Sequence, residues 1–60
     1  MDTKNLPIGT KLHNEYGNWV ITNVTHFDNA TWYDVKVERG EVVAYHDQIG
    51  THYKLGDQAA

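Results

Sequence analysis

A β-hairpin is predicted by the stretch Thr31-Trp32-Tyr33-Asp34-Val35-Lys36-Val37, Glu38-Arg39-Gly40 and Glu41-Val42-Val43-Ala44-Tyr45. In its first arm polar and apolar residues alternate, so that Tyr33, Val35 and Val37 share one face. Alternation of β-branched and aromatic residues with a period of two is the sequence signal of a strand. The other segments of the chain are interpreted around this hairpin.

The turn of the hairpin sets its register. A two-residue Arg39-Gly40 loop would place Glu38 opposite Glu41 and would require a positive φ at Arg39. A three-residue loop over residues 38–40, with Gly40 in the left-handed position of a G1 bulge, avoids both costs. The expected cross-strand pairs are therefore Val37 with Glu41, Val35 with Val43, and Tyr33 with Tyr45.

This register predicts a mixed face on the hairpin, where charged and apolar side chains lie together. The members of that face are Trp32, Asp34, Lys36, Val42 and Ala44. An apolar patch rimmed by charges is typical of a protein interface, and exposed aromatic residues often anchor such interfaces. We therefore predict a binding site around Trp32 that consists of Trp32, Asp34, Lys36 and Val42, with Tyr16 from a preceding turn.

The remaining segments predict three more strands. Short strands are expected over residues 10–13 and 51–55, and a longer one over residues 19–27. The longer strand is apolar on both faces, which is typical of strands that bend at the corners of small barrels. Residues 46–50 fit a single 3₁₀ turn that Gly50 caps, with Ile49 buried. Residues 1–6 and 56–60 are expected to be flexible.

Five short strands with a helical turn before the last resemble an SH3-like barrel over residues 7–55. The resemblance is carried by Ile8-Gly9-Thr10-Lys11-Leu12, Trp19-Val20, Tyr33-Asp34-Val35-Lys36-Val37, Arg39-Gly40 and Asp47-Gln48-Ile49. The chain is similar to compact barrels encoded by phages, plasmids and other mobile elements. The resemblance implies an all-β, five-stranded barrel. The rival OB-fold requires a helix between its third and fourth strands, and no segment here fits one.

Composition excludes several classes of protein. Sixty residues make one domain with a small core. The absence of cysteine excludes disulfides and thiolate metal sites. A net charge of −3, from five basic and eight acidic residues, disfavours a protein that works by neutralising phosphates. No apolar run is long enough for a transmembrane helix or a signal peptide, so a cytoplasmic location is expected.

No catalytic or metal-binding motif is present. Of the four histidines, His13, His26, His46 and His52, only the last two have a spacing that nominally fits a zinc site, and no second pair exists. His46 and Asp47 are adjacent, but neighbours on a strand point to opposite faces, and the chain has no serine or cysteine nucleophile. We therefore expect no cofactor, no metal and no enzymatic activity.

One enzyme family with this type of fold is retained as a third hypothesis. Type II dihydrofolate reductases are SH3-like barrels of similar size that build one pore from four subunits and carry a Val-Gln-Ile-Tyr strand. The comparable strand here, Val42-Val43-Ala44-Tyr45, lacks the glutamine. The favoured expectation is a small non-enzymatic module, phage- or plasmid-encoded, that binds a protein partner or a second copy of itself. Nucleic-acid binding is the alternative.

Overall fold

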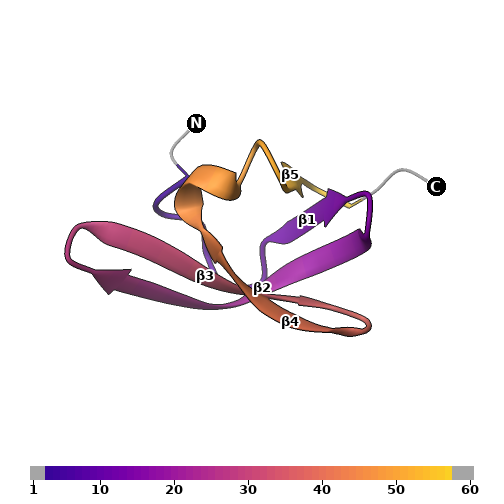
Figure 1. The fold of residues 1–60 in the computed structure, drawn as a ribbon, viewed down its shortest axis with the longest axis horizontal. Helices are drawn as coiled ribbons and strands as arrows, with labels where there is room; N and C mark the ends of the chain where they lie inside the picture. Colours follow the sequence, from indigo (N-terminus) through magenta and orange to yellow (C-terminus); the bar gives the residue numbers. More distant parts are fainter. Residues whose placement is uncertain (1–2, 58–60) are drawn as a thin grey trace.

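The computed structural model describes residues 3–57, which form one five-stranded antiparallel sheet (Figure 1). The elements are β1 (Lys11–Asn14), β2 (Gly17–Phe27), β3 (Ala30–Val37), β4 (Gly40–Tyr45), the 3₁₀ turn η1 (His46–Gln48) and β5 (Lys54–Leu55). The all-β prediction is therefore confirmed. The terminal residues 1–2 and 58–60, which were predicted to be flexible together with their neighbours, lie outside the described residues.

The strand order is β4-β3-β2-β1-β5, so β4 and β5 are the two edges of the sheet. Within residues 3–57 these edges do not pair with each other, and the expected closure of a barrel is not observed. The sheet instead curves, and β1, η1 and β5 lie over one side of the long strands (Figure 1). The buried apolar side chains between these layers are Leu12, Trp19, Ile21, Tyr33, Val35, Ala44 and Ile49.

The β2–β3 connection is a two-residue turn formed by Asp28 and Asn29, between the paired residues Phe27 and Ala30. Both turn residues have positive φ, 53° for Asp28 and 64° for Asn29. A type I′ turn requires this conformation at both positions, and Asp and Asn tolerate it better than other side chains. The short polar turn thus sets the register of the longest hairpin.

The predicted register of the β3–β4 hairpin is wrong by one residue. The observed pairs are Val37 with Gly40, Lys36 with Glu41, Val35 with Val42, Asp34 with Val43, Tyr33 with Ala44, and Trp32 with Tyr45. The loop is Glu38-Arg39, and neither residue needs a positive φ. This register places Lys36 opposite Glu41, which is a favourable charge pair. It also places Ala44, rather than Tyr45, beside the buried ring of Tyr33.

A β-bulge in β2 explains why that strand looked apolar on both faces. Ile21 pairs with Val35 and Asn23 pairs with Asp34, so Thr22 is an extra residue between them. An extra residue reverses the alternation of the strand. Ile21 before the bulge is buried, and Val24 after it also packs against the core. The strand bends as predicted, but it stays within one sheet.

The predicted 3₁₀ turn is observed as η1, and Ile49 after it is buried. The side-chain carbonyl of Gln48 accepts the backbone N–H of Tyr45 at 2.9 Å, which holds the start of the turn. The backbone carbonyl of Gln48 accepts the N–H groups of Thr51, His52 and Tyr53. Because these three amides converge on one carbonyl, β5 begins only at Lys54, later than the sequence predicts.

The phenol of Tyr33 fixes the segment before β1. Its O–H donates to the carbonyl of Thr3, and its oxygen accepts the N–H of Leu6 at 3.2 Å. The ring itself is fully buried, and the side chain of Leu6 packs against the same core. Residues from Thr3 onward are therefore tied to the sheet by a buried polar group.

Candidate functional site

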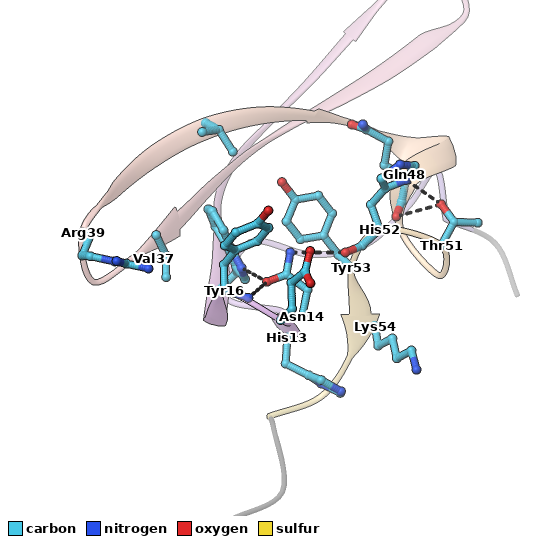
Figure 2. Close-up of a pocket in the computed structure, with 13 residues that line it drawn as sticks. His13, Asn14, Tyr16, Val37, Arg39, Gln48, Thr51, His52, Tyr53 and Lys54 are labelled. Atoms are coloured by element: carbon cyan, nitrogen blue, oxygen red, sulfur yellow. Dashed lines mark hydrogen bonds between the residues drawn. The ribbon is translucent and has the colours of Figure 1, made fainter.

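A groove of about 670 Å³ opens on the side of the sheet that η1 and β5 cover in part (Figure 2). We call it the aromatic groove. Its walls come from the β1–β2 turn, the β3–β4 hairpin and the segment from η1 to β5. The lining residues are His13, Asn14, Glu15, Tyr16, Trp19, Val37, Arg39, Val42, Gln48, Thr51, His52, Tyr53 and Lys54.

Asn14 holds two of these walls together. Its side-chain oxygen accepts the backbone N–H of Tyr16 at 2.9 Å and the indole N–H of Trp19 at 2.8 Å. Its side-chain N–H₂ donates to the carbonyl of His52 at 3.2 Å. One amide thus folds the β1–β2 turn, orients the indole and joins the turn to the segment before β5. Side chains fixed in this way lose little entropy on binding a ligand.

The apolar lining consists of aromatic rings and valines. Trp19 and Tyr53 meet edge to face, with 5.3 Å between their ring centroids. Burial raises the pKa of the Tyr53 phenol. Figure 2 shows Tyr16 and Tyr53 between the hairpin tip that carries Arg39 and the turn that carries Gln48. Tyr16 is 62% exposed. The groove therefore offers a fixed aromatic pair, Trp19 and Tyr53, and an exposed aromatic residue, Tyr16.

The rim of the groove is polar and mixed in charge. Arg39 and Lys54 are cationic and Glu15 is anionic, and all three are exposed. The imidazole of His13 hydrogen-bonds the carbonyl of Gly56 at 2.8 Å, so that ring is held to the neighbouring backbone. An apolar centre with a polar rim is the usual anatomy of a protein-binding surface.

The structure divides the predicted binding site between two sides of the sheet. Tyr16 and Val42 line the aromatic groove. Trp32, Asp34 and Lys36 lie on the opposite face, because Val42 pairs with Val35 and not with a residue beside Trp32. Ala44, which the predicted register placed on the face of Trp32, is buried.

The second surface is a convex patch formed by Trp32, Val43 and Tyr45. The rings of Trp32 and Tyr45 are paired across the strands, with their centroids 4.6 Å apart. Trp32 is 42% exposed and Val43 is 62% exposed. The register error explains why Val43 and Tyr45 were missed, since the three-residue loop had placed both in the core.

Sequence reasoning also missed Trp19, Val37 and Tyr53 as members of the groove. They meet only because β1 pairs with both β2 and β5, which brings together turns that are distant in the chain. The one local signal was Asn14, a residue type that bonds the backbone two residues ahead in a turn. Such a signal locates the turn but not the segment that packs on it.

Among residues 3–57, no three side chains of the kinds that ligate metals lie close enough to hold an ion. Within the same residues no helix is long and apolar enough to cross a membrane. No protein-family model, curated protein or solved structure matches the chain. A function has to be argued from the two surfaces.

Proposed function

We propose that this chain is a small non-enzymatic binding module that holds a segment of a protein partner in the aromatic groove. The observation that carries the proposal is an open groove lined by Tyr16, Trp19 and Tyr53, in which Asn14 holds the indole of Trp19 and the backbone of Tyr16, and Tyr53 packs on Trp19. Aromatic side chains at the centre of an interface supply most of its binding energy. A groove of this size also falls in the range of ligand sites.

The topology supports the wider resemblance to SH3-like barrels. Five antiparallel strands and a 3₁₀ turn before β5 are features that the resemblance implies. In an SH3-like barrel the sheet would close on the side that carries the aromatic groove. We propose that the partner segment binds on this side. Val37 and Val42 would then contact the partner from the hairpin.

Single-stranded nucleic acid is the second candidate, and one observation favours it. Arg39 and Lys54 both lie on the rim, near the exposed ring of Tyr16. Single-strand binders combine basic side chains with aromatic rings on which bases stack. Against it stands Glu15 on the same rim and the net charge of −3. A protein segment therefore remains the favoured ligand.

The test selects peptides from a displayed random library against the whole chain and then titrates the enriched peptides against variants. Tyr16→Ala should weaken their binding by about 30-fold, which corresponds to the roughly 2 kcal/mol of a hot-spot aromatic. Val42→Asp should act in the same direction, because it puts a charge on the apolar wall. Trp32→Ala, on the opposite face, should leave binding unchanged.

Two results would contradict this proposal. The first is a set of enriched peptides that bind the wild-type chain and the Tyr16→Ala variant equally well. The second is binding of labelled single-stranded oligonucleotides that is stronger than that of every peptide, falls with added salt and is lost in an Arg39→Ala variant. That second result would instead support nucleic-acid binding.

A further inference from the structure

We propose that β4 is a self-pairing edge, through which two copies of the chain form an antiparallel dimer with its two-fold axis at Val43. The two five-stranded sheets would then form one continuous antiparallel sheet. The side chain of Val43 lies on the face of the sheet opposite the aromatic groove, and the proposal does not depend on what the groove binds.

Hairpin geometry shows which backbone groups of β4 point outward. Val37 and Gly40 flank a two-residue loop, so they form a hydrogen-bonded pair. Along an antiparallel hairpin, hydrogen-bonded pairs alternate with pairs that share no backbone hydrogen bond. Glu41, Val43 and Tyr45 therefore direct their N–H and C=O groups away from β3. The N–H of Tyr45 confirms this direction, because it donates to the side chain of Gln48 and not to β3.

The outward amides of Glu41 and Val43 have no partner within residues 3–57. Proteins usually protect such an edge with lysine, proline, a bulge or a very short strand. β4 has six residues and none of these features. Its one charge, Glu41, faces Lys36 of its own sheet. By contrast, the other edge, β5, has only two residues, and Gly56 follows it.

A two-fold axis at Val43 makes the edge complementary to itself. Val43 lies opposite Val43 of the second copy, so these two residues exchange both backbone hydrogen bonds. Glu41 then lies opposite Tyr45 of the second copy, whose N–H and C=O are both occupied by Gln48 of its own chain, so the backbone bonds between the copies are those of the Val43 pair. This offset keeps Glu41 away from its own symmetry mate, and like charges directly opposite would be unfavourable.

The exposed side chains favour the same arrangement. Val43 is exposed in the isolated chain and would pack against its symmetry mate on the convex face. The Trp32–Tyr45 ring pair of each copy would then lie beside this contact, since Tyr45 is two residues from Val43 on the same face. The largest apolar groups on the convex side of β3 and β4 would thus join one continuous contact.

Cysteine cross-linking tests the axis directly, because the natural chain contains no cysteine. In a hydrogen-bonded antiparallel pair the two Cα atoms are about 5.5 Å apart, within the range that a disulfide spans. Val43→Cys should therefore form a disulfide-linked dimer of twice the 6.9 kDa chain under mild oxidation. Phe27→Cys, at a more exposed site far from the edge, should react much more slowly.

Sedimentation of uncross-linked protein supplies the second measurement. The wild-type chain should dimerise reversibly, and Val43→Lys should shift its dissociation constant upward by at least ten-fold. Phe27→Lys should leave it unchanged. A synthetic chain with an N-methyl group on the amide of Val43 should also be monomeric while melting normally, because that N–H bonds nothing within the described chain.

Three outcomes would overturn the proposal. The wild-type chain could remain monomeric up to about 1 mM, the weak end of specific association. Val43→Lys and Phe27→Lys could weaken association equally, which would indicate a general apolar contact. The N-methylated chain could dimerise as well as the unmodified one, which would exclude pairing through the β4 backbone. In each case the peptide titrations on the groove would still stand on their own.

Discussion

The indole N–H of Trp19 donates to the side-chain oxygen of Asn14 at 2.8 Å, and Asn14 also binds the backbone on either side of the groove. Trp19 is 7% exposed, so its N–H would otherwise be buried without a partner. A buried donor that loses its acceptor costs about 1–3 kcal/mol. The shape of the groove and the stability of the chain therefore depend on the same amide.

Asn14→Ala should lower the free energy of unfolding by about 1–3 kcal/mol, as measured by denaturant titration. It should also weaken the binding of any groove ligand, because Tyr16 and the segment at His52 lose their connection. Asn14→Asp keeps the acceptor for Trp19 but loses the donor to His52. It should therefore fall between the wild type and Asn14→Ala. Equal stability of all three proteins would contradict this role.

Trp32 and Trp19 should respond very differently to truncation. Trp19→Ala removes a core ring and should cost about 3–5 kcal/mol, enough to unfold so small a domain. Trp32→Ala removes a half-exposed ring whose main contact is Tyr45, and should cost about 0.5–1.5 kcal/mol. Thermal melts of both variants provide the measurement. An unfolded Trp32→Ala chain would show that this ring belongs to the core.

The type I′ turn makes a specific demand on Asn29, whose φ is 64°. Asn29→Val should cost about 1–2 kcal/mol, because a β-branched residue is strained in the left-handed region. Asn29→Gly should keep full stability. Arg39→Val is the matched control, since the other two-residue loop has no residue of positive φ, and it should change stability by less than about 0.5 kcal/mol. Equal costs at the two loops would refute the turn assignment.

Tyr33→Phe should separate the anchoring of the N-terminal segment from the core. The ring keeps its packing, but the bonds to Thr3 and Leu6 are lost. The expected cost is about 1 kcal/mol. Hydrogen exchange at the amide of Leu6 should quicken far more than exchange in the central strands. Unchanged exchange at Leu6 would mean that other contacts hold the segment.

Burial raises the pKa of Tyr53 above the ordinary value of 10.0, so the folded state holds this proton more tightly than the unfolded state. Above about pH 10 the unfolded chain loses the proton first, and the free energy of unfolding should fall as the pH rises further. Below pH 10 both states are protonated, and this group should contribute no pH dependence. Tyr53→Phe should show a smaller decline in chemical denaturation between pH 9 and about pH 11. An identical decline would remove Tyr53 as a cause.

Local signals in the sequence were sufficient for the number and order of the strands, the 3₁₀ turn and the burial of Ile49, but not for the start of β5. The register of the β3–β4 hairpin was not predictable in the same way, because loops of different length and position fit the same residues and each gives a different register. The three-residue loop was favoured because it avoided pairing Glu38 with Glu41, but a loop over Glu38 and Arg39 avoids that pair as well. The observed register places Lys36 opposite Glu41 and the small Ala44 beside Tyr33, and the turn residues alone do not reveal these pairs.

The candidate site was harder to predict than the fold for a related reason. A face assigned by alternation moves to the other side of the sheet when the register shifts by one residue. Val42 and Val43 exchanged sides in this way, and the predicted site divided with them. The groove also required the pairing of β1 with β5, which no local pattern reveals.

The strands pair over very different distances along the chain, and this difference predicts an order in which they fold. β2, β3 and β4 are joined by two-residue turns, and hairpins of this kind form in about 1–10 μs. The pairing of Leu12 with Leu55 closes a loop on the order of forty residues, whose entropy must be lost before the contact forms. We therefore expect the groove to form last and to open first, by release of β5 while β2, β3 and β4 stay paired. Its occupancy should register first as slower hydrogen exchange in Lys54 and Leu55.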